Sequence, residues 1–336
     1  MRATRAAWHA ILAAAFLSMG CAKPAWSACL SSLQAVPPDL VTRAHAGQVW
    51  VPTGWTQLGS RKGYPDEQSA TGLTRVRGFW MDRTEVTNAQ FAAFVKDSGY
   101  VTEAERQGGG AVFEAPTPAS HLSRGLAWWR FVPGANWRHP GGPGSDLRGR
   151  EAFPVVLVTL ADALAYARWL GRDLPTEAEW EHAAKAGRLD PGLDAAPRDA
   201  RGRPTANYWQ GSFPLLDLAE DGHAGLAPAG CYPANRWGLH DMIGNAWELT
   251  LDAYTGARQP HANGDPAVLR ARTEGQGRRV VIKGGSFLCA PDYCVRYRAS
   301  AREAHEADLA TSHVGFRTIT RSGPRPPLSS PRPTQP

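Results

Sequence analysis

The sequence predicts an α+β fold that forms a single loop-rich domain with little regular secondary structure. Among its 336 residues are 35 Gly, 27 Pro and 13 Trp, beside few long apolar runs. Gly and Pro interrupt helices and strands, and indole rings can fill the gaps between irregular segments. Strand and helix patterns are spread from about Val49 to Ile319 without an internal repeat, which favours one domain over two.

The domain is expected to begin with short strands and to contain a long loop. QVWVPTGWTQLGS and VRGFWMDRTEV have strand composition, and a polar loop containing Tyr64-Pro65-Asp66-Glu67 separates them. From Gly108 to Arg150 no period is visible. Because Trp128, Trp129 and Trp137 lie there among many Gly and Pro, we expect an ordered loop that packs through its aromatic rings.

Helix signals recur three times. TNAQFAAFVKDSGY begins at Thr87, with a Gln three residues on, and ends at Gly99. Further along, FPVVLVTLADALAYARWLG predicts a buried strand at Val155 to Val158 and a helix that ends near Gly171. LPTEAEWEHAAKAG then predicts another helix, because Thr176 and the Glu three residues later form a capping box.

The residues best suited to chemistry lie in GGSFLCAPDYCVRYRASAR, from Gly284 to Arg302. Cys289 and Cys294 follow a Gly-Gly-Ser turn and precede Arg-Tyr-Arg. Glycines permit positive φ and close backbone approach, so the two at this turn would let Ser286 and the thiols face a groove. Two cysteines in an exported protein also often form a structural disulfide. The pattern alone therefore leaves a reactive pair and a disulfide open.

The N-terminus has the layout of a secretory signal covering residues 1–27. Two Arg precede an apolar stretch from about Ala6 to Met19, and small residues surround a cleavage point after Ser27. The apolar stretch is too short for a stable membrane span. A lipid anchor at Cys21 is the alternative, although Ser18 stands where a larger aliphatic residue is expected. We expect an exported protein, periplasmic or secreted, with an irregular segment at 28–48 before the domain at 49–320.

The net charge of +6 does not indicate a nucleic-acid partner. Three basic residues lie in the signal region and three in the tail at 321–336, with no acid in either segment. The remaining core is therefore close to neutral, and it lacks the basic footprint that a phosphate backbone requires. The tail is Pro-rich without apolar periodicity, so we expect it to be disordered.

Several phrases together resemble the formylglycine-generating enzymes, also called sulfatase-modifying factors. They are FWMDRTEVTNAQFAAFV, GANWRHPGGPGS, LPTEAEWEHAA, NYWQGSFP, EDGHAGLAP, NRWGLHDMIGNAWELT, GGSFLCAPDYCVRYRASAR and HVGFRT, and they cover nearly all of the chain between signal and tail. The resemblance implies the fold of the formylglycine-generating-enzyme and C-type-lectin-like superfamily. LPTEAEWE and GNAWE recur across that superfamily, including binding modules, so they indicate the fold alone.

The thiol pair carries the implied activity. By resemblance, the thiolates of Cys289 and Cys294 bind Cu(I), a client cysteine joins them, and O2 converts that cysteine to Cα-formylglycine. Soft thiolates do select Cu(I) over harder divalent ions. The client is a sulfatase polypeptide carrying a C-x-P-x-R type motif. The resemblance adds Ser286 to the catalytic residues and implies a substrate pocket formed by Trp247, Tyr293 and His313.

Two departures from the family pattern concern structure and pocket chemistry. The four positions of two structural disulfides in well-known eukaryotic members are filled here by Ala167, Ala184, Ala299 and Thr318. His313 stands where many family enzymes have Asn. A His can still donate a hydrogen bond, although its protonation would make the pocket sensitive to pH. Because the flanking GFR matches the family closely, we favour the interpretation that His313 is a harmless variant of the subfamily.

The resemblance also implies two structural Ca²⁺ sites. One set comprises Asp241, Glu248 and the carbonyls of Gly244 and Ala246. The other comprises Asn207, Asp221 and the carbonyls of Tyr208 and His223. Such oxygen ligands suit Ca²⁺. From the residues alone, these segments indicate turns with Asp at capping positions.

The sequence contains no HExxH, GxSxG, Walker loop or dinucleotide fingerprint. Cys231 has no evident partner and is expected to be buried, while Cys29 could cross-link or stay free. The sequence thus predicts a copper-dependent oxidase that activates sulfatases. The alternative is a secreted, calcium-stabilised binding module in which Cys289 and Cys294 form a disulfide.

Overall fold

The structure of the chain is a computed structural model that describes residues 37, 39–68, 72–116, 128–189, 195–256, 258 and 278–321. The expected signal at 1–27, the alternative lipid anchor at Cys21, Cys29 and the tail beyond Arg321 lie outside the described residues. Arg321 itself belongs to the folded part, because its guanidinium pairs with Asp173 at 2.5 Å and Glu179 at 2.8 Å. In the described ranges, no helix has both the length and the apolar character needed to cross a membrane.

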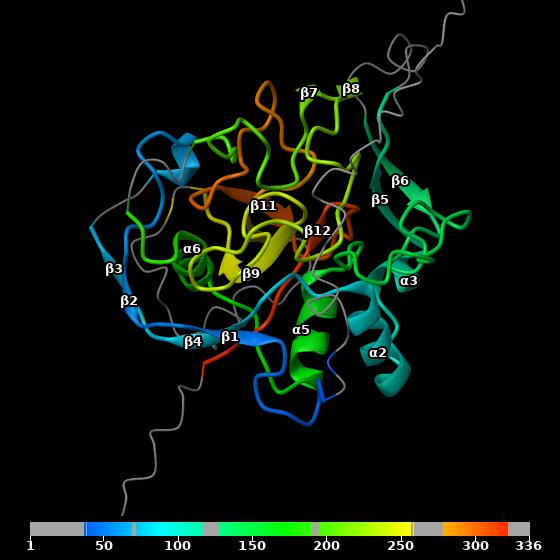
Figure 1. The fold of residues 1–336 in the computed structure, drawn as a ribbon. Coiled ribbons are helices and arrows are strands. Elements are labelled where there is room, and N and C mark those ends of the chain that lie inside the picture. The colour runs from blue at the N-terminus through cyan, green and yellow to red at the C-terminus, as the bar shows by residue number, and fades with distance from the viewer. Residues whose placement is uncertain are drawn as a thin grey trace, which may run out of the picture.

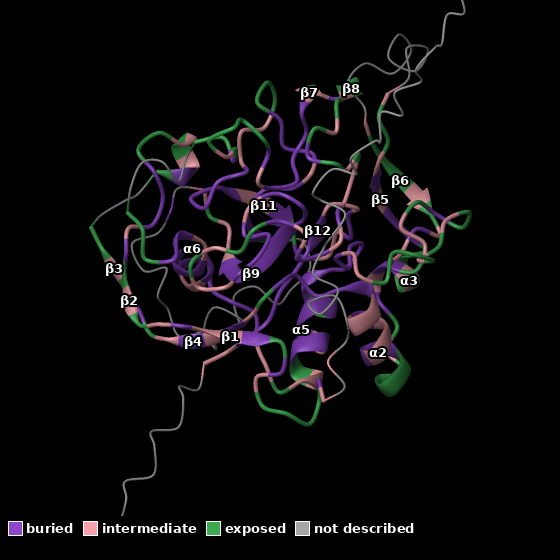
Figure 2. Ribbon diagram, in the orientation of Figure 1, coloured by how far each residue is buried: buried purple, intermediate pink, exposed green. Residues whose placement is uncertain are grey.

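A four-stranded sheet occupies the centre of the molecule (Figure 1). Its strands run in the order β11 (Arg302–Glu306), β10 (Arg279–Lys283), β9 (Trp247–Ala253) and β12 (Val314–Gly315). β10 pairs antiparallel with both neighbours, whereas β12 runs parallel to β9. All of β9 except its last residue is buried (Figure 2). The thiol segment connects β10 to β11, so this sheet fixes both of its ends.

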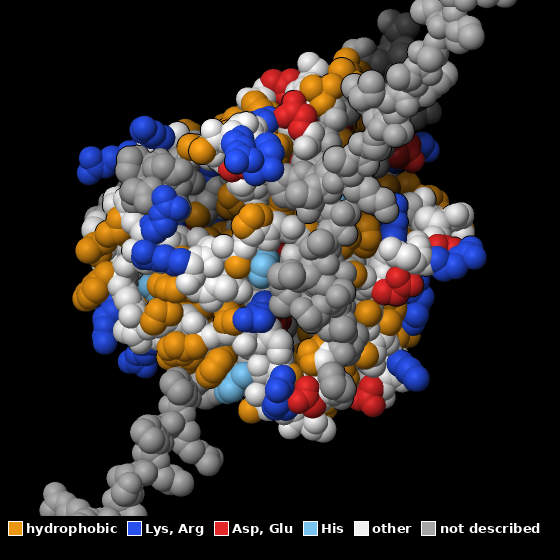
Figure 3. All heavy atoms as spheres, in the orientation of Figure 1, with side chains coloured by type: hydrophobic (Ala, Val, Ile, Leu, Met, Phe, Trp, Pro, Cys, Tyr) orange, Lys and Arg blue, Asp and Glu red, His pale blue; other side chains and the backbone are white. Residues whose placement is uncertain are grey.

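A second sheet joins the beginning and the end of the domain. β4 (Phe79–Asp82) lies between β1 (Gln48–Val51) and β13 (Ile319–Thr320), antiparallel to both. β2 (Gly54–Thr56) pairs with β3 (Thr74–Val76) beside it. Apolar side chains gather over these strands in Figure 3, and Trp55 and Leu73 are more than half exposed there.

The helices begin at the caps that the sequence indicates. α2 (Asn88–Ser98), α5 (Leu160–Trp169) and α6 (Glu177–Lys185) each follow a Thr whose hydroxyl accepts a hydrogen bond from the backbone N–H three residues on. These confirm the three predicted helices. A fourth, α3 (Glu103–Gln107), has the same kind of cap. α2 and α5 lie side by side (Figure 1), with stacked rings of Phe91 and Tyr166 between them.

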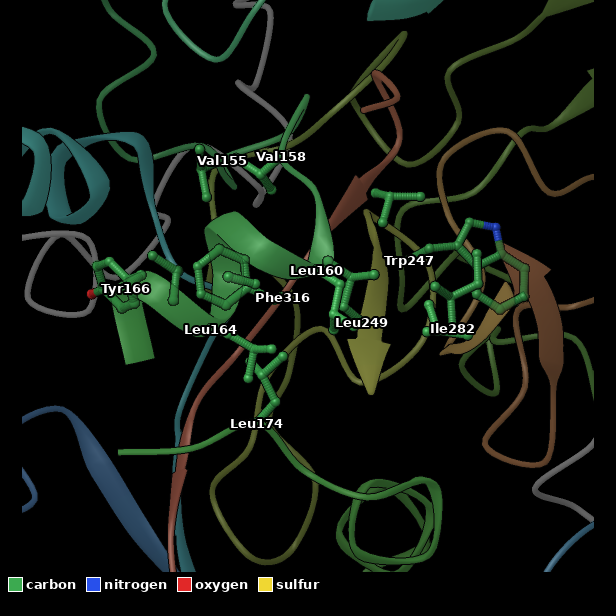
Figure 4. Close-up of a cluster of buried hydrophobic side chains, with 14 of the residues drawn as sticks. Val155, Val158, Leu160, Leu164, Tyr166, Leu174, Trp247, Leu249, Ile282 and Phe316 are labelled. Carbon is green, nitrogen blue, oxygen red and sulfur yellow. The ribbon is translucent and has the colours of Figure 1, made fainter. Parts of the chain in front are cut away.

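The largest buried cluster fills the space between α2, α5 and the central sheet. Figure 4 shows Leu164 and Tyr166 of α5 approaching Phe316, with Leu249 and Trp247 of β9 beyond them. Cys289 belongs to this same cluster and is 1% exposed. The thiol segment is therefore anchored in the core by one of its two cysteines.

Two predictions about local structure are wrong. The stretch from Gly108 to Arg150 contains the hairpin of β5 (Gly109–Phe113) and β6 (Trp129–Pro133) rather than loop alone. Residues Val155 to Val158 are buried but form no strand. Their backbone bonds go to two different segments, Val155 N–H to the Val86 carbonyl and Leu157 N–H to the Thr311 carbonyl. Leu157 also has φ 58°, which interrupts an extended chain.

Candidate functional site

A double-glycine turn directs the chain out of β10 and into the thiol segment. Gly284 has φ 96° and Gly285 has φ 80°, both in the region that favours glycine. A Cβ on Gly285 would lie 2.6 Å from the carbonyl oxygen of Arg296. The turn therefore needs glycine for conformation and for close approach, because the chain before Cys289 packs directly on the chain after Cys294.

Cys289 and Cys294 face each other as free thiols. Their Sγ atoms are 3.0 Å apart, well beyond the disulfide bond length of about 2.05 Å. The disulfide of the binding-module alternative is thus not formed. The N–H of Cys289 donates to the Ser286 carbonyl at 3.0 Å, and the N–H of Cys294 donates to the Ala290 carbonyl at 3.1 Å. Two local turns therefore present the two sulfur atoms to one another.

The two thiols differ in their tendency to ionise. Burial raises the pKa of Cys289 well above its usual range, and the neighbouring Cys294 raises it further. The pKa of Cys294 is lowered by the hydrogen bond from Cys289 and then by the charge of Arg296. Of the two thiols, Cys294 therefore loses its proton more readily than Cys289.

Ser286 stabilises the turn before Cys289 through its backbone carbonyl and its side-chain hydroxyl. It is fully buried, and its Oγ accepts a hydrogen bond from the Leu288 N–H at 3.2 Å. This contact stabilises the turn that leads to Cys289. Any direct role of Ser286 in chemistry remains a prediction from the resemblance.

Trp247 and His313 lie beside each other at the start of the parallel pair β9–β12. The N–H of Trp247 donates to the His313 carbonyl at 2.9 Å, and the ring of His313 packs against Trp129 with centroids 4.5 Å apart. Burial lowers the pKa of His313 to about 3. At this pKa the ring is neutral at physiological pH, so no pH sensitivity of the pocket is expected from His313.

An aromatic cluster borders Cys294, and it combines the predicted pocket residue Tyr293 with Phe213 and Trp128, which were not predicted to lie at the site. Tyr293 is 52% exposed and stacks on Phe213 at 4.3 Å, and Trp128 contacts both rings edge-on. Phe213 also packs on Trp209, whose backbone N–H donates to the Cys289 carbonyl at 3.0 Å. The aromatic-rich phrases GLAWWR and NYWQGSFP are the sequence signal of this cluster, but only the fold brings them to the thiols.

A cavity of about 790 Å³ adjoins the thiol segment. Phe287, two residues before Cys289, and Ser312, next to His313, line it, but neither thiol and neither Trp247, Tyr293 nor His313 does. Phe113 and Trp209 provide apolar walls, and Asp217 also lines the cavity. A space of this size can take several residues of an extended polypeptide.

Several oxygen atoms of the first predicted Ca²⁺ site, the one around Asp241, already accept hydrogen bonds from other residues. Asp241 Oδ2 accepts the Gly230 N–H at 2.5 Å, whereas its buried Oδ1 has no hydrogen-bond partner within the described ranges. Both carboxylate oxygens of Glu248 accept hydrogen bonds from Arg317. Glu85, which the sequence analysis missed, interacts with Asp241 and keeps its Oε2 unpaired. Burial raises the pKa of both Glu85 and Asp241.

The second predicted set keeps one oxygen unpaired. Asn207 uses its amide N–H groups on the Gly225 carbonyl and on Asn245 Oδ1, while its own buried Oδ1 has no partner in the described part of the chain. Asp221 accepts the N–H groups of Tyr208 and His223, each at 3.0 Å. Burial raises its pKa to about 6. Orphaned oxygens in both sets fit a hard cation.

The prediction that Cys231 lacks a partner is wrong. Cys231 is disulfide-bonded. It is also half-buried rather than buried. Within the described ranges, no three side chains of His, Cys, Asp or Glu are grouped to hold a metal ion.

Comparison with known proteins extends these observations. A family model described as the sulfatase-modifying factor enzyme 1-like domain matches residues 34–322. The formylglycine-generating enzyme of Streptomyces coelicolor is 42% identical over 292 residues, which cover 83% of this chain and 91% of the relative. The inactive C-alpha-formylglycine-generating enzyme 2 of Bos taurus is 37% identical over 292 residues, covering 83% and 89%.

A solved structure, PvdO from Pseudomonas aeruginosa, matches with a TM-score of 0.56. It is 23% identical and covers 81% of this chain and 93% of its own, a likeness that shows the fold alone. The predicted loop-rich α+β fold is thereby confirmed. Since one relative in this range is named inactive, similarity over the chain must be weighed together with the thiol pair.

Proposed function

Since the chain belongs to the formylglycine-generating enzyme, or sulfatase-modifying factor, family, we propose that it oxidises a cysteine of a sulfatase polypeptide to Cα-formylglycine, using O2 and Cu(I). The observation that carries the proposal is the pair of free thiols whose Sγ atoms lie 3.0 Å apart. Cys289 is anchored in the core, and Cys294 borders the aromatic cluster of Tyr293, Phe213 and Trp128. The family name of the relatives supplies the client class.

The donor set suits a soft monovalent ion. Two thiolates select Cu(I) over harder divalent cations, and both must lose their protons to bind it. The lowered pKa of Cys294 favours loss of its proton, and Cys289, whose pKa is raised, would also have to release its proton to hold the ion. Bound copper would supply the one-electron chemistry by which O2 is activated. A site of two protein sulfurs leaves room for a client thiol as a third ligand.

The surrounding residues would control access and water. Cys294 is half-buried while Cys289 is 1% exposed, so a client sulfur reaches the pair from the Cys294 side. Tyr293 and Phe213 form an apolar rim on that side and exclude water from the thiols. His313 stays neutral at physiological pH, and its buried Nδ1 is unpaired in the described part of the chain. It could accept one hydrogen bond from the client chain.

Electron balance sets a condition on the reaction. Conversion of the client thiol side chain to an aldehyde releases hydrogen sulfide and oxidises the side-chain carbon by two electrons. Reduction of O2 to the level of water takes four electrons, with one oxygen atom ending in the aldehyde and one in water. Two further electrons and two protons must therefore come from two external thiol groups, which join in a disulfide.

We further propose that Ca²⁺ stabilises the two oxygen sets and that the protein is exported. The unpaired oxygens of Asn207 and Asp241 support the first point. The disulfide at Cys231 supports the second, because such bonds persist in oxidising compartments. The signal layout at residues 1–27 supports export too.

Mass spectrometry of a client peptide tests this function. A peptide containing C-x-P-x-R is incubated with the protein, Cu(I), O2 and dithiothreitol, and an aldehyde is trapped with a hydroxylamine reagent. We expect aldehyde only when protein, copper and O2 are all present. An intact cysteine in the complete mixture would reject the proposed reaction.

A further inference from the structure

The loop from Gly59 to Gln68 lies against the chain that follows the second thiol. It contains the short helix η2 (Pro65–Glu67) and is far from Cys294 in sequence. The N–H of Val295 donates to the Tyr64 hydroxyl at 3.4 Å. The guanidinium of Arg296 lies 4.4 Å from the centre of the Tyr64 ring, within cation–π range. Tyr64 thus touches both residues that follow Cys294.

The same loop holds the carbonyl of Val295 through one intermediary. Glu67 is fully buried, and its Oε2 accepts Arg298 Nη2 at 2.5 Å and the Tyr64 N–H at 2.9 Å. Arg298 in turn donates from Nε to the Val295 carbonyl at 2.6 Å. Both backbone polar groups of Val295 are therefore held by this loop, one directly and one through Arg298.

A third contact completes the attachment. The carboxylate of Asp66 accepts hydrogen bonds from Arg296 Nη1 at 3.2 Å and from the Tyr254 hydroxyl at 3.0 Å. Because Tyr254 directly follows β9, the second bond also joins the loop to that strand. Arg296 also pairs with Glu303 of β11 at 3.2 Å. The Arg296 side chain is consequently directed along this row of acids, and its backbone N–H donates to the Cys294 carbonyl at 2.8 Å.

From these contacts we propose that Tyr64 and Glu67 are positioning residues for Cys294, holding its Sγ opposite Cys289 by fixing the peptide groups of Val295. The proposal rests on the proposed function in one respect, that the two sulfurs act together. Residues behind metal-binding or reacting groups orient them, and loss of such a residue commonly weakens metal binding tenfold or more. A reactive constellation also tolerates displacements of only about 0.5 Å.

Removing one oxygen atom from Tyr64 can distinguish a role in positioning Cys294 from a general role in the stability of the fold. Tyr64→Phe removes the hydroxyl that faces Val295 and keeps the ring that packs on Arg296. Tyr100→Phe is the matched control, because it removes a hydroxyl that donates to Asp162 of α5 at 3.0 Å, away from the thiol segment in sequence. We expect both variants to melt at similar temperatures, and only Tyr64→Phe to change the thiol segment.

Three measurements report a change in the thiol segment. Amide hydrogen exchange in the peptide spanning 289–298 should be about tenfold faster in Tyr64→Phe than in the wild type. Cu(I) affinity, measured by competition with bicinchoninate, should be about tenfold weaker. With the client peptide, kcat should fall while KM stays the same, which is the split expected of a residue that acts through Cys294 rather than on the client. Tyr100→Phe should match the wild type in all three.

Arg298→Lys provides a second, independent variant. Lysine keeps the positive charge that pairs with Glu67, but it lacks the second donor group of the guanidinium, the Nε–H that reaches the Val295 carbonyl. We expect it to reproduce the copper and exchange effects of Tyr64→Phe, even where it melts lower. Wild-type Cu(I) affinity and wild-type exchange in both variants would overturn the positioning role. If the wild type makes no aldehyde, the proposed function fails, but the exchange and copper readouts still decide this inference.

Discussion

Arg317 and Glu248 form a two-point ion pair in the interior, with Nη2–Oε1 at 2.6 Å and Nε–Oε2 at 2.7 Å. Neither side chain is more than 1% exposed. Trp180 of α6 donates its indole N–H to the same Glu248 Oε2 at 2.7 Å. The pair thus joins β9, α6 and the chain after β12. It also competes for the carboxylate that the family resemblance assigns to Ca²⁺.

Removing one partner of this pair should unfold the protein more easily. In Arg317→Met the Glu248 carboxylate stays buried without its counter-charge, so we expect a loss of about 3–5 kcal/mol in the free energy of unfolding. Urea denaturation measures it. Arg43→Met is the control, since the exposed pair Arg43–Asp39 should contribute little. A wild-type midpoint for Arg317→Met would show that the ion pair is not structural.

Sequence patterns predicted α2, α5, α6 and the outer strands because their signals are local, whereas the short helix α3 was not predicted. Thr caps, apolar spacing and terminal Gly depend on neighbours within one turn, so α2, α5 and α6 emerge close to their observed bounds. The segment Val155 to Val158 could not be predicted correctly. Its burial reflects contacts with Val86 and Thr311, which are distant in sequence, and the positive φ of Leu157 has no local signal.

Calcium removal should lower the melting temperature without altering the thiols. A ligand that binds only the folded state stabilises it in proportion to ln(1 + [L]/Kd). We expect EGTA to lower the melting temperature of the wild type and to have a smaller effect on Asn207→Ala, which lacks one ligand oxygen. Differential scanning fluorimetry and elemental analysis provide the readouts. No Ca²⁺ in the purified protein and no shift with EGTA would remove both sites.

Asp252 should make stability depend on pH. Burial, followed by the charge of Glu177, raises its pKa to about 7 from the usual value of 3.8. The folded state holds this proton more tightly than the unfolded state. Its stabilising contribution is therefore complete below about pH 4 and is lost as pH rises to about 7.

Asp252→Asn should abolish that pH dependence. The amide oxygen can still accept the Glu177 N–H, which Asp252 Oδ2 accepts at 2.6 Å. We expect the variant to be more stable than the wild type by a few kcal/mol at pH 8 and similar to it at pH 4. Urea titrations at both pH values measure the difference. A difference that is the same at pH 4 and pH 8 would contradict the raised pKa.

His313 should not titrate in the working range. Because burial holds its pKa at about 3, the ring is neutral from pH 5 to pH 8. The kcat/KM profiles of the wild type and His313→Asn should therefore have the same shape, even if their heights differ. An inflection near pH 6 that is present in the wild type and absent from the variant would show that the ring does protonate.

The candidate site was only partly predictable from the sequence. The spacing and flanking glycines of Cys289 and Cys294 identify the pair, and family resemblance gives it a role. The partners that arrange it come from remote segments, such as Tyr64 and Trp209, whose contacts with the thiol segment depend on the folded loops. Nor does sequence show that burial neutralises His313, since its neighbour Trp129 lies on a hairpin that was not predicted.

The most direct test of the central claim is aldehyde formation by three proteins, the wild type, Cys289→Ser and Cys294→Ser. Each is incubated with the client peptide, Cu(I), O2 and dithiothreitol after its melting temperature has been measured. A serine hydroxyl is a hard, poorly ionised ligand and cannot replace a soft thiolate. The account predicts aldehyde from the wild type and none from either variant, with all three folded. Unimpaired oxidation by either serine variant would contradict it.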